Sequence, residues 1–116
     1  MDVVREFRSK AVVLHVLHHA AAGEVHGAGV SAELARHGYK ISPGTLYPLL
    51  HRLQAAGLLV SREVLEAGRR RRLYRATGAG RRTLAACRRA LAELAGELLD
   101  RPAGSRRQRR TSTRPG

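Results

Sequence analysis

The chain has little of several residue types that mark other classes of protein. Its single cysteine, Cys87, excludes an internal disulfide and favours a reducing compartment, so we expect a cytoplasmic protein. No stretch approaches the roughly 18 apolar residues that a membrane-spanning helix needs, so we expect no membrane partner. The charged residues at positions 2, 5, 6 and 8 lead us to expect no secretory signal peptide.

Acidic residues are also scarce. The chain has nine of them against 22 lysines and arginines, which gives a formal net charge of +13 at pH 7. Only Lys10 and Lys40 are lysines, and arginine has a planar guanidinium that pairs with phosphates and guanine edges. This excess indicates a polyanionic partner, either DNA or RNA, with a membrane surface less favoured. Codon bias in a GC-rich genome contributes to the arginine content but does not explain where the charges lie.

Hydrophobic periodicity predicts helices in the first part of the chain, which at 116 residues should form one small domain. Residues 5–21 form the first predicted helix. One apolar stripe of this helix contains Phe7, Ala11, Leu14, His18 and Ala21. Because Val12 and Val16 lie on another side, we expect the helix to pack between its own domain and a partner chain. A second helix is predicted over 27–37, with Gly38 just beyond its end.

The periodicity changes after the third helix and predicts a hairpin. Residues 58–64 and 69–76 alternate as two strands joined by a turn at 66–68, and Thr77 can cap a last helix over about 78–99. Three helices followed by a hairpin predict a mainly α fold with a small β-hairpin (α+β). This order is that of a winged helix-turn-helix.

The stretch ISPGTLYPLLHRLQAAG (41–57) predicts a third helix, over residues 42–56, with two different faces. Its core face contains Leu46, Leu49, Leu50 and Leu53. Its opposite face contains Gly44, Tyr47, Pro48 and His51, flanked by Thr45 and Arg52. Ser42 can cap the helix, and Pro43 suits its first position. Since glycine and proline are poor helix formers, their shared outward face predicts close approach to another surface, and the helix N-terminus favours phosphate.

The last predicted helix carries an apolar seam, which indicates a dimer. Its members, Leu84, Cys87, Leu91, Leu94 and Leu98, step by three and four residues. One short chain cannot bury such a seam, so these residues are expected to form a dimer interface. The predicted division is a winged helix-turn-helix DNA-binding domain (1–76), a dimerisation helix (77–100) and a tail (101–116). The tail has six arginines and no acidic residue, and it is expected to be disordered.

Two motifs resemble the PadR family of bacterial transcriptional regulators. ISPGTLYPLLHRLQAAGLL (41–59) is similar to that family's recognition helix, and GRRRRLYRATGAGRRTL (68–84) is similar to its wing and the start of its last helix. The resemblance covers roughly residues 8–98, and the short last helix resembles the small-protein branch of the family. It implies a homodimeric winged helix-turn-helix repressor that reads a palindromic operator and dimerises through its C-terminal helix.

The third helix and the wing together give an expected DNA interface, from the helical wheel and from the resemblance. Helix 42–56 is expected in the major groove and the wing, 65–72, on the DNA backbone. The expected contacts are Lys40, Ser42, Pro43, Gly44, Thr45, Tyr47, Pro48, His51, Arg52, Arg69, Arg70, Arg71, Arg72 and Tyr74. By resemblance, Tyr74 either reaches the backbone or packs beneath the wing. The expected partners are double-stranded DNA at the nucleoid, a second copy of the chain and an unidentified small-molecule effector.

Other constellations favour structural roles. His15 and His19 have the i, i+4 spacing of helical metal ligands, but no cysteine pair accompanies them, so we expect no metal. Cys87 within the seam is expected to be a small buried hydrophobe rather than an exposed redox sensor. No catalytic motif or phosphate-binding loop is readable, so neither an enzyme nor a cofactor is expected.

Two alternative functions remain open at this point. A general basic nucleic-acid-binding protein, nucleoid-like or RNA-binding, would rely mainly on the arginine-rich tail. A winged-helix adaptor for other proteins is a further alternative, which the charge disfavours. A footprint on a defined palindrome would support the sequence-specific regulator, whereas uniform coating of any duplex would support the general binder.

Overall fold

The computed structural model describes residues 1–99, so the tail for which the sequence predicts disorder (101–116) lies outside the described residues. The elements are α1 (Val3–Ala22), α2 (Gly27–Arg36), α3 (Pro43–Ala55), β1 (Leu59–Glu66), β2 (Arg69–Ala76) and α4 (Gly78–Leu98). This is the order expected of a winged helix-turn-helix with an added C-terminal helix. Within residues 1–99, no helix is both long and apolar enough to cross a bilayer.

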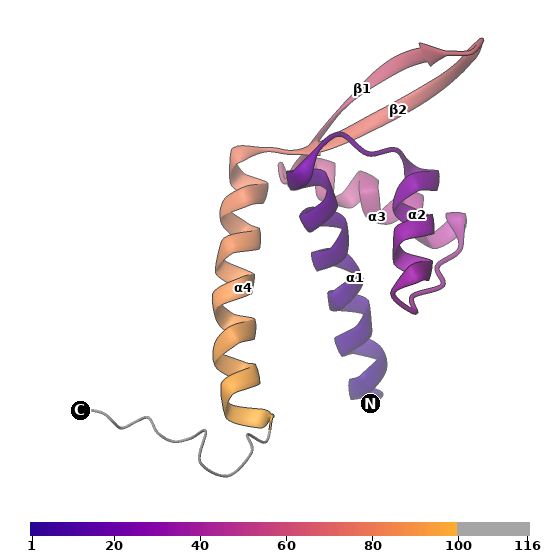
Figure 1. The fold of residues 1–116 in the computed structure, drawn as a ribbon. Helices are drawn as coiled ribbons and strands as arrows, with labels where there is room; N and C mark the ends of the chain where they lie inside the picture. The colour runs from indigo at the N-terminus through magenta and orange to yellow at the C-terminus, as the bar shows by residue number, and fades with distance from the viewer. Residues whose placement is uncertain (100–116) are drawn as a thin grey trace.

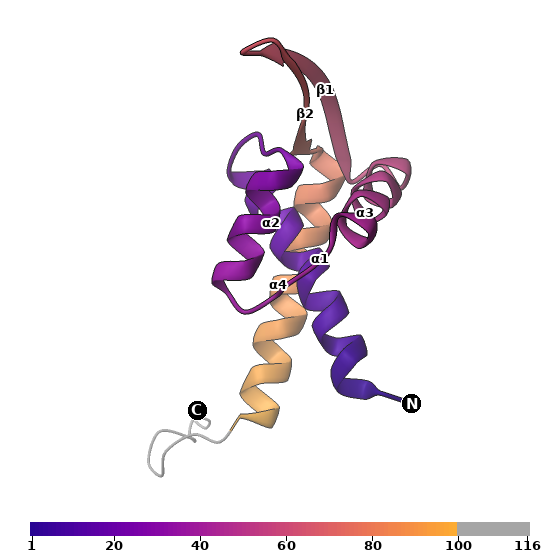
Figure 2. The same cartoon turned by 90° about the vertical axis from the view of Figure 1, so that its right-hand side faces the viewer.

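The helices form two groups on either side of α1. In Figure 1, α4 runs antiparallel to α1 on one side, while α2 and α3 lie on the other side. The view in Figure 2 shows the hairpin projecting away from the helices, at the end of the molecule where α4 begins. The two ends of the fold therefore present different surfaces: the hairpin at one end, and the C-terminal half of α4 at the other.

Local chemistry explains where the helices begin and end. The Asp2 carboxylate accepts a hydrogen bond from the Arg5 amide (3.0 Å) and caps α1. Gly38 follows α2 with a φ of +86°, a left-handed conformation that glycine adopts at low cost. Thr77 caps α4 as predicted, since its hydroxyl accepts from the Gly80 amide (3.0 Å). Gly80 itself is buried, and a Cβ there would overlap the carbonyl oxygen of Leu58.

The hairpin is a regular antiparallel pair whose register runs from Leu59 opposite Ala76 to Glu66 opposite Arg69. Its turn therefore has two residues, Ala67 and Gly68, with φ angles of 52° and 76°. Two left-handed residues in a two-residue turn match the right-handed twist of paired strands. The strands predicted for this region are present, and the first of them begins one residue later and extends two residues further than expected.

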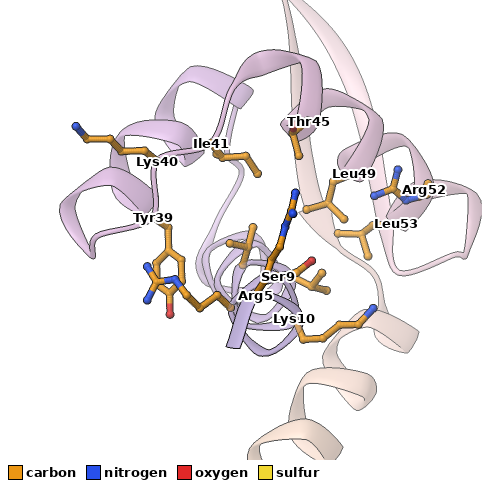
Figure 3. A pocket seen from close by; sticks show the side chains of 13 residues that line it. Arg5, Ser9, Lys10, Tyr39, Lys40, Ile41, Thr45, Leu49, Arg52 and Leu53 are labelled. Atoms are coloured by element: carbon orange, nitrogen blue, oxygen red, sulfur yellow. The ribbon is translucent and has the colours of Figure 1, made fainter. Parts of the chain in front are cut away.

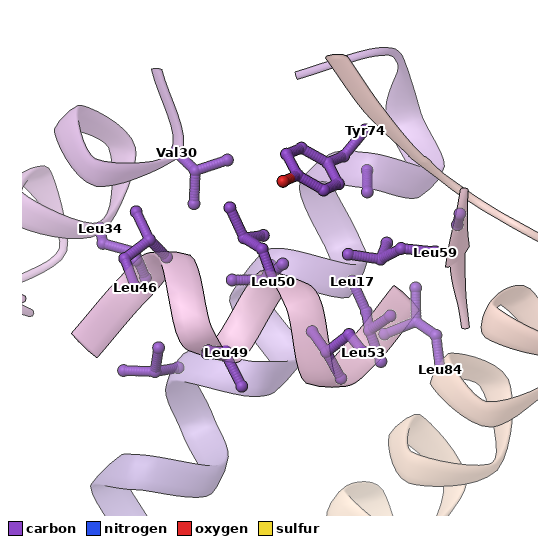
Figure 4. Close-up of a cluster of buried hydrophobic side chains, with 14 residues drawn as sticks. Leu17, Val30, Leu34, Leu46, Leu49, Leu50, Leu53, Leu59, Tyr74 and Leu84 are labelled. Carbon is purple, nitrogen blue, oxygen red and sulfur yellow. The ribbon is translucent and has the colours of Figure 1, made fainter. Parts of the chain in front are cut away.

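The core lies between α1, α2, α3 and the base of the hairpin (Figure 4). The four leucines predicted for the core face of α3 are all buried: Leu46, Leu49, Leu50 and Leu53. Of the two apolar sides predicted for α1, the one with Val12 and Val16 enters the core, together with Leu17 and Ala20. Phe7 and His18, from the predicted stripe, are exposed, since α2, α3 and the hairpin all cover the valine side.

Candidate nucleic-acid interface

The outward face of α3 is open along its length. Every residue that the sequence placed on this face or beside it is exposed, namely Lys40, Ser42, Pro43, Gly44, Thr45, Tyr47, Pro48, His51 and Arg52. The helix continues through Pro48 to Ala55, so the proline is not a stop signal. Because the leucines anchor the opposite face, these side chains are presented by a rigid helix rather than by a loop.

The N-terminus of α3 differs from the expectation in one respect. Ser42 occupies the N-cap position, but its side chain accepts no hydrogen bond from a backbone amide. Its hydroxyl instead pairs with the hydroxyl of Thr45 at 3.2 Å. The backbone carbonyl of Ser42 closes the first turn by accepting from the amides of Thr45 (3.0 Å) and Leu46 (2.9 Å). The two hydroxyls therefore form a small polar group at the positive end of the helix dipole.

The ring of Tyr47 lies against the first residue of α2. A Cβ atom at Gly27 would lie 2.6 Å from the Tyr47 hydroxyl oxygen and from a ring carbon, so only glycine allows this approach. Tyr47 nevertheless remains 43% exposed. The sequence indicated Tyr47 as a contact residue but did not predict its support by Gly27. The signal available was a glycine immediately after His26, whose Nδ1 caps α2 by accepting from the Gly29 amide (3.1 Å).

A hollow of about 260 Å³ joins this part of α2 and α3 to the second strand of the hairpin. It is lined by His26, Gly27, Ala28, Tyr47, Arg70, Arg71 and Arg72. The two segments that the sequence placed at the DNA, α3 and the wing, thus meet at one surface, together with the start of α2, which the sequence did not place there. Amides at a helix N-terminus, a phenolic hydroxyl and guanidinium groups are all donors to phosphate oxygens.

The wing arginines are partly neutralised by glutamates of β1, which the sequence reading missed. Glu63 pairs with Arg70 (3.4 Å) and Arg72 (3.2 Å), and Glu66 pairs with Arg71 (3.2 Å). These carboxylates lie across the strand register from the arginines, so the alternation of the two strands was the available signal. With six arginines against two glutamates, the hairpin (59–76) remains positive, and the pairs are exposed enough to exchange for phosphate at small cost.

Tyr74 is the one expected DNA contact that the structure corrects. Its side chain is 2% exposed and packs in the core beside Leu50 (Figure 4). Its backbone also pairs with Val25, through N···O distances of 2.7 and 2.9 Å. Burial raises the pKa of its hydroxyl above the ordinary value. Tyr74 therefore supports the wing from beneath and does not reach a ligand with its ring.

The base of the wing is tied to the loop that precedes α2. Glu24 accepts two hydrogen bonds from the Arg62 guanidinium, at 2.6 and 2.7 Å. Hydrogen bonding to Arg62 holds the pKa of the Glu24 carboxyl below its ordinary value. This bidentate pair has a fixed geometry and connects β1 to the 23–26 loop, so it helps to orient the hairpin relative to α2.

On the other side of α1, an apolar groove of about 350 Å³ separates α1 from α4. Its apolar lining residues are Phe7, Ala11, Leu14, Leu84, Cys87 and Leu91. The residues of the expected dimer seam differ in burial along α4. Leu84 is 4% exposed and belongs to the chain's own core, which corrects its assignment to the interface, while Leu91, Leu94 and Leu98 are 48%, 42% and 66% exposed. Cys87 is half-buried between them.

A group of histidines borders this groove. His15 stacks on His37, with ring centroids 5.2 Å apart, and meets the Tyr39 ring in a tilted arrangement with centroids 5.1 Å apart. Burial lowers the pKa of His15, and the neighbouring His37, His19 and His18 lower it further. His18 meets Arg88 of α4, with 2.8 Å between its Nδ1 and a guanidinium nitrogen. In the part of the chain that is described, no three His, Cys, Asp or Glu side chains converge as metal ligands would.

Comparison with known proteins identifies the family to which this geometry corresponds. Residues 16–86 match the Transcriptional regulator PadR-like family. The chain is 64% identical over 96 residues to Transcriptional regulator Rv3488 of Mycobacterium tuberculosis, which covers 83% of this chain and 90% of that protein.

Solved structures show the same fold. A PadR family transcriptional regulator from Eggerthella lenta is 34% identical, with a TM-score of 0.70 over 86% of this chain and 91% of that one. Bacillus subtilis PadR, solved in complex with operator DNA, is 15% identical, with a TM-score of 0.60 over 82% of this chain and 51% of that one.

Proposed function

The chain belongs to the PadR-like family of transcriptional regulators, and we propose that it is a homodimeric repressor that binds a palindromic operator. One observation carries the proposal: α3 buries all its leucines in its own domain, yet leaves its entire opposite face exposed. An exposed face with a proline and a glycine makes no contact with the core of its own domain, and it fits the DNA major groove.

We assign different roles to α3 and to the wing. The exposed face of α3 lies where it can meet base edges, with Tyr47 and His51 as its hydrogen-bonding side chains. Arg69, Arg70 and the rest of the wing hold phosphates on the backbone, which fixes the register of the protein without reading sequence. Tyr47 is shared between the two roles, since it also borders the hollow below the wing arginines.

Dimerisation would place two DNA-binding surfaces, each formed by one α3 and one wing, on one operator. The exposed leucines of α4 and the apolar side of α1 form the surface that we assign to the second copy. This corresponds to a DNA-binding domain over 1–76 and a dimerisation helix over 77–100, except that Leu84 anchors the helix to its own domain. A palindromic site reflects the two-fold symmetry of such a dimer. The repressor would act at the nucleoid, in the cytoplasm.

Selection of bound duplexes from a random DNA pool tests the proposal. We expect recovery of a palindrome, and we expect the selected duplex to bind at least about 1,000-fold more tightly than a scrambled duplex at the same salt concentration. Recovery of no shared sequence, with equal binding to scrambled DNA or RNA, would instead support a general basic nucleic-acid-binding protein.

Removal of residues 101–116 separates two contributions to DNA binding: the nonspecific affinity that comes from the tail's charge, and the sequence preference that comes from the rest of the chain. The tail's six arginines should neutralise phosphates without choosing bases. Deletion should weaken operator and scrambled duplex by similar factors. It should also flatten the dependence of log affinity on log salt by about 0.9 for each phosphate that the tail had neutralised. A deletion that removes the preference for the operator would show that the tail reads sequence.

A further inference from the structure

A third cavity, of about 570 Å³, lies between α1 and α3, and the function proposed above assigns no ligand to it. We call it the α1–α3 pocket (Figure 3). Its walls are the N-terminal half of α1, the connector 39–41 and the inner side of α3. Its floor is apolar and consists of Val12, Val13, Ile41, Leu49 and Leu53. This volume falls within the range of small-molecule sites, roughly 300–1,000 Å³.

The rim of the α1–α3 pocket carries charges of one sign. Five of its lining residues are cations, Arg5, Arg8, Lys10, Lys40 and Arg52, and none is acidic. None of these five takes part in an ion pair recorded within residues 1–99, in contrast to three of the wing arginines. A concave surface lined by one sign of charge concentrates the positive potential and attracts an anion.

Arg8 shapes the pocket rather than remaining free for a ligand. Its guanidinium donates a hydrogen bond to the carbonyl oxygen of Gly38 (3.1 Å) and lies 4.7 Å from the centre of the Tyr39 ring. It thereby fixes the connector against α1. Arg5, Lys10, Lys40 and Arg52 make no such side-chain contact among the described residues. Lys40 extends away from Arg5 and Arg52 in Figure 3, so Arg5, Lys10 and Arg52 are the groups available to an anion.

We propose that the α1–α3 pocket binds a small amphipathic organic anion. The apolar body of the ligand would lie on the floor, and a carboxylate or sulfonate group would be held by Arg5, with Lys10 and Arg52 beside it. The chain's own tail does not fit, because its six arginines would be repelled by the cationic rim. DNA phosphates can approach the rim but have no apolar group for the floor.

A second copy of the chain is also a poorer occupant. The residues of α1 that line this pocket, such as Arg5 and Ser9, are on a different side of the helix from Phe7 and Leu14, which face the groove beside α4. Dimerisation through that groove therefore leaves the α1–α3 pocket accessible.

The position of the pocket predicts an effect on DNA, and this part rests on the proposed function. Lys40 and Arg52 are both lining residues and expected DNA contacts, while Leu49 and Leu53 connect the floor to α3. A bound anion neutralises part of the charge that DNA needs, so it should weaken operator binding. By linkage, DNA should weaken anion binding by the same factor.

The test uses decanoate as the anion and decanol as the neutral molecule of the same chain length. Both are titrated calorimetrically into the full-length protein without DNA, below their aggregation limits. We expect decanoate to bind at least about tenfold more tightly than decanol, and Arg5→Gln to weaken decanoate by about tenfold. Arg89→Gln removes the same charge from the face of α4 opposite the leucine seam and should leave decanoate affinity unchanged.

Two further arms make the outcomes distinct. Ser9→Trp, at an exposed lining position, should block the pocket while circular dichroism stays unchanged. Equal decanoate affinity in wild type, Arg5→Gln and Ser9→Trp would overturn the site, and equal binding of decanol would overturn the role of charge. Decanoate binding that leaves affinity for the selected operator unchanged would overturn the coupling. Failure to recover any operator would overturn the proposed function while the calorimetric result still decides the site.

Discussion

α3 and α4 both carry a stripe of leucines, but the chain's own domain buries only the stripe of α3 in full. The four leucines of α3 are covered by α1, α2 and the hairpin, whereas in α4 only Leu84 is buried and the later members of the stripe are exposed. α3 thus needs no further apolar contact, and its other face is free for a polar partner. α4 still needs one, and its exposed leucines indicate a partner as apolar as itself. The same sequence pattern therefore leads to two different kinds of recognition.

Charging the exposed half of α4 should have the largest effect. Leu91→Asp with Leu94→Asp should give a monomer in sedimentation, because two carboxylates cannot be buried in an apolar interface. Operator affinity should fall by about 100-fold or more, since the two DNA-binding surfaces are no longer joined in one molecule. Circular dichroism should stay unchanged, because both positions are exposed in the single chain. A double variant that remains dimeric would contradict our assignment of the interface.

Truncation of one leucine in each helix compares the two stripes directly. Leu50→Ala in α3 should lower the free energy of unfolding by about 2–5 kcal/mol, because Leu50 is fully buried and a cavity would remain. Leu98→Ala in α4 should cost less than about 1 kcal/mol in dilute protein. Chemical denaturation followed by circular dichroism measures both. Similar losses in the two variants would show that the stripes are equally buried.

The outward face of α3 should affect DNA binding rather than stability. Tyr47→Ala should weaken operator binding by about 1–3 kcal/mol, as expected for one well-placed contact. Tyr47→Phe is the matched control, since it keeps the ring against Gly27 and removes only the hydroxyl. Gel-shift titration of both variants separates the hydroxyl from the ring. Unchanged affinity of Tyr47→Ala, with the fold intact, would count against α3 as the recognition helix.

The smallest expected effect is a pH dependence of folding stability, which arises from His15 in the groove between α1 and α4. The pKa of His15 lies below its ordinary value of 6.5 in the folded chain, so the unfolded chain binds more protons between the two values. Stability should therefore be fully present above pH 6.5 and fall as pH drops through the lowered folded-state pKa. His15→Gln should flatten this slope in denaturation curves taken at several pH values, and His51→Gln on α3 serves as the control. A slope that rises toward acid pH would contradict the assignment.

The sequence predicted what depends on local spacing. The order of elements, the two faces of α3 and the cap at Thr77 all follow from residues within one or two helical turns of one another. The side of α1 that enters the core could not be predicted, because both its stripes are apolar and distant segments decide which is covered. Leu84 could not be separated from Leu91 for a similar reason: the part of α4 that its own domain covers depends on packing against distant segments, such as Leu58, whose carbonyl lies close to Gly80.

The candidate interface was predicted in outline for the same reason. Exposure of the α3 residues follows from the leucine spacing, so that part needed no tertiary information. The burial of Tyr74 and the pairing of Glu63 with two wing arginines depend on how the hairpin lies against α2 and on its register. The support of Tyr47 by Gly27 brings together two helices that a wheel drawn on either one alone does not connect.

Sequence-specific binding by a dimer is tested most directly by the stoichiometry and the sequence preference of binding to a selected palindrome. Native mass spectrometry of the full chain with the palindromic duplex, a single half-site and a scrambled duplex of equal length gives both quantities at one salt concentration. We expect two chains on the palindrome, with much weaker binding to the half-site and to the scrambled duplex. Chains that load on all three duplexes equally, in numbers that grow with DNA length, would contradict this expectation.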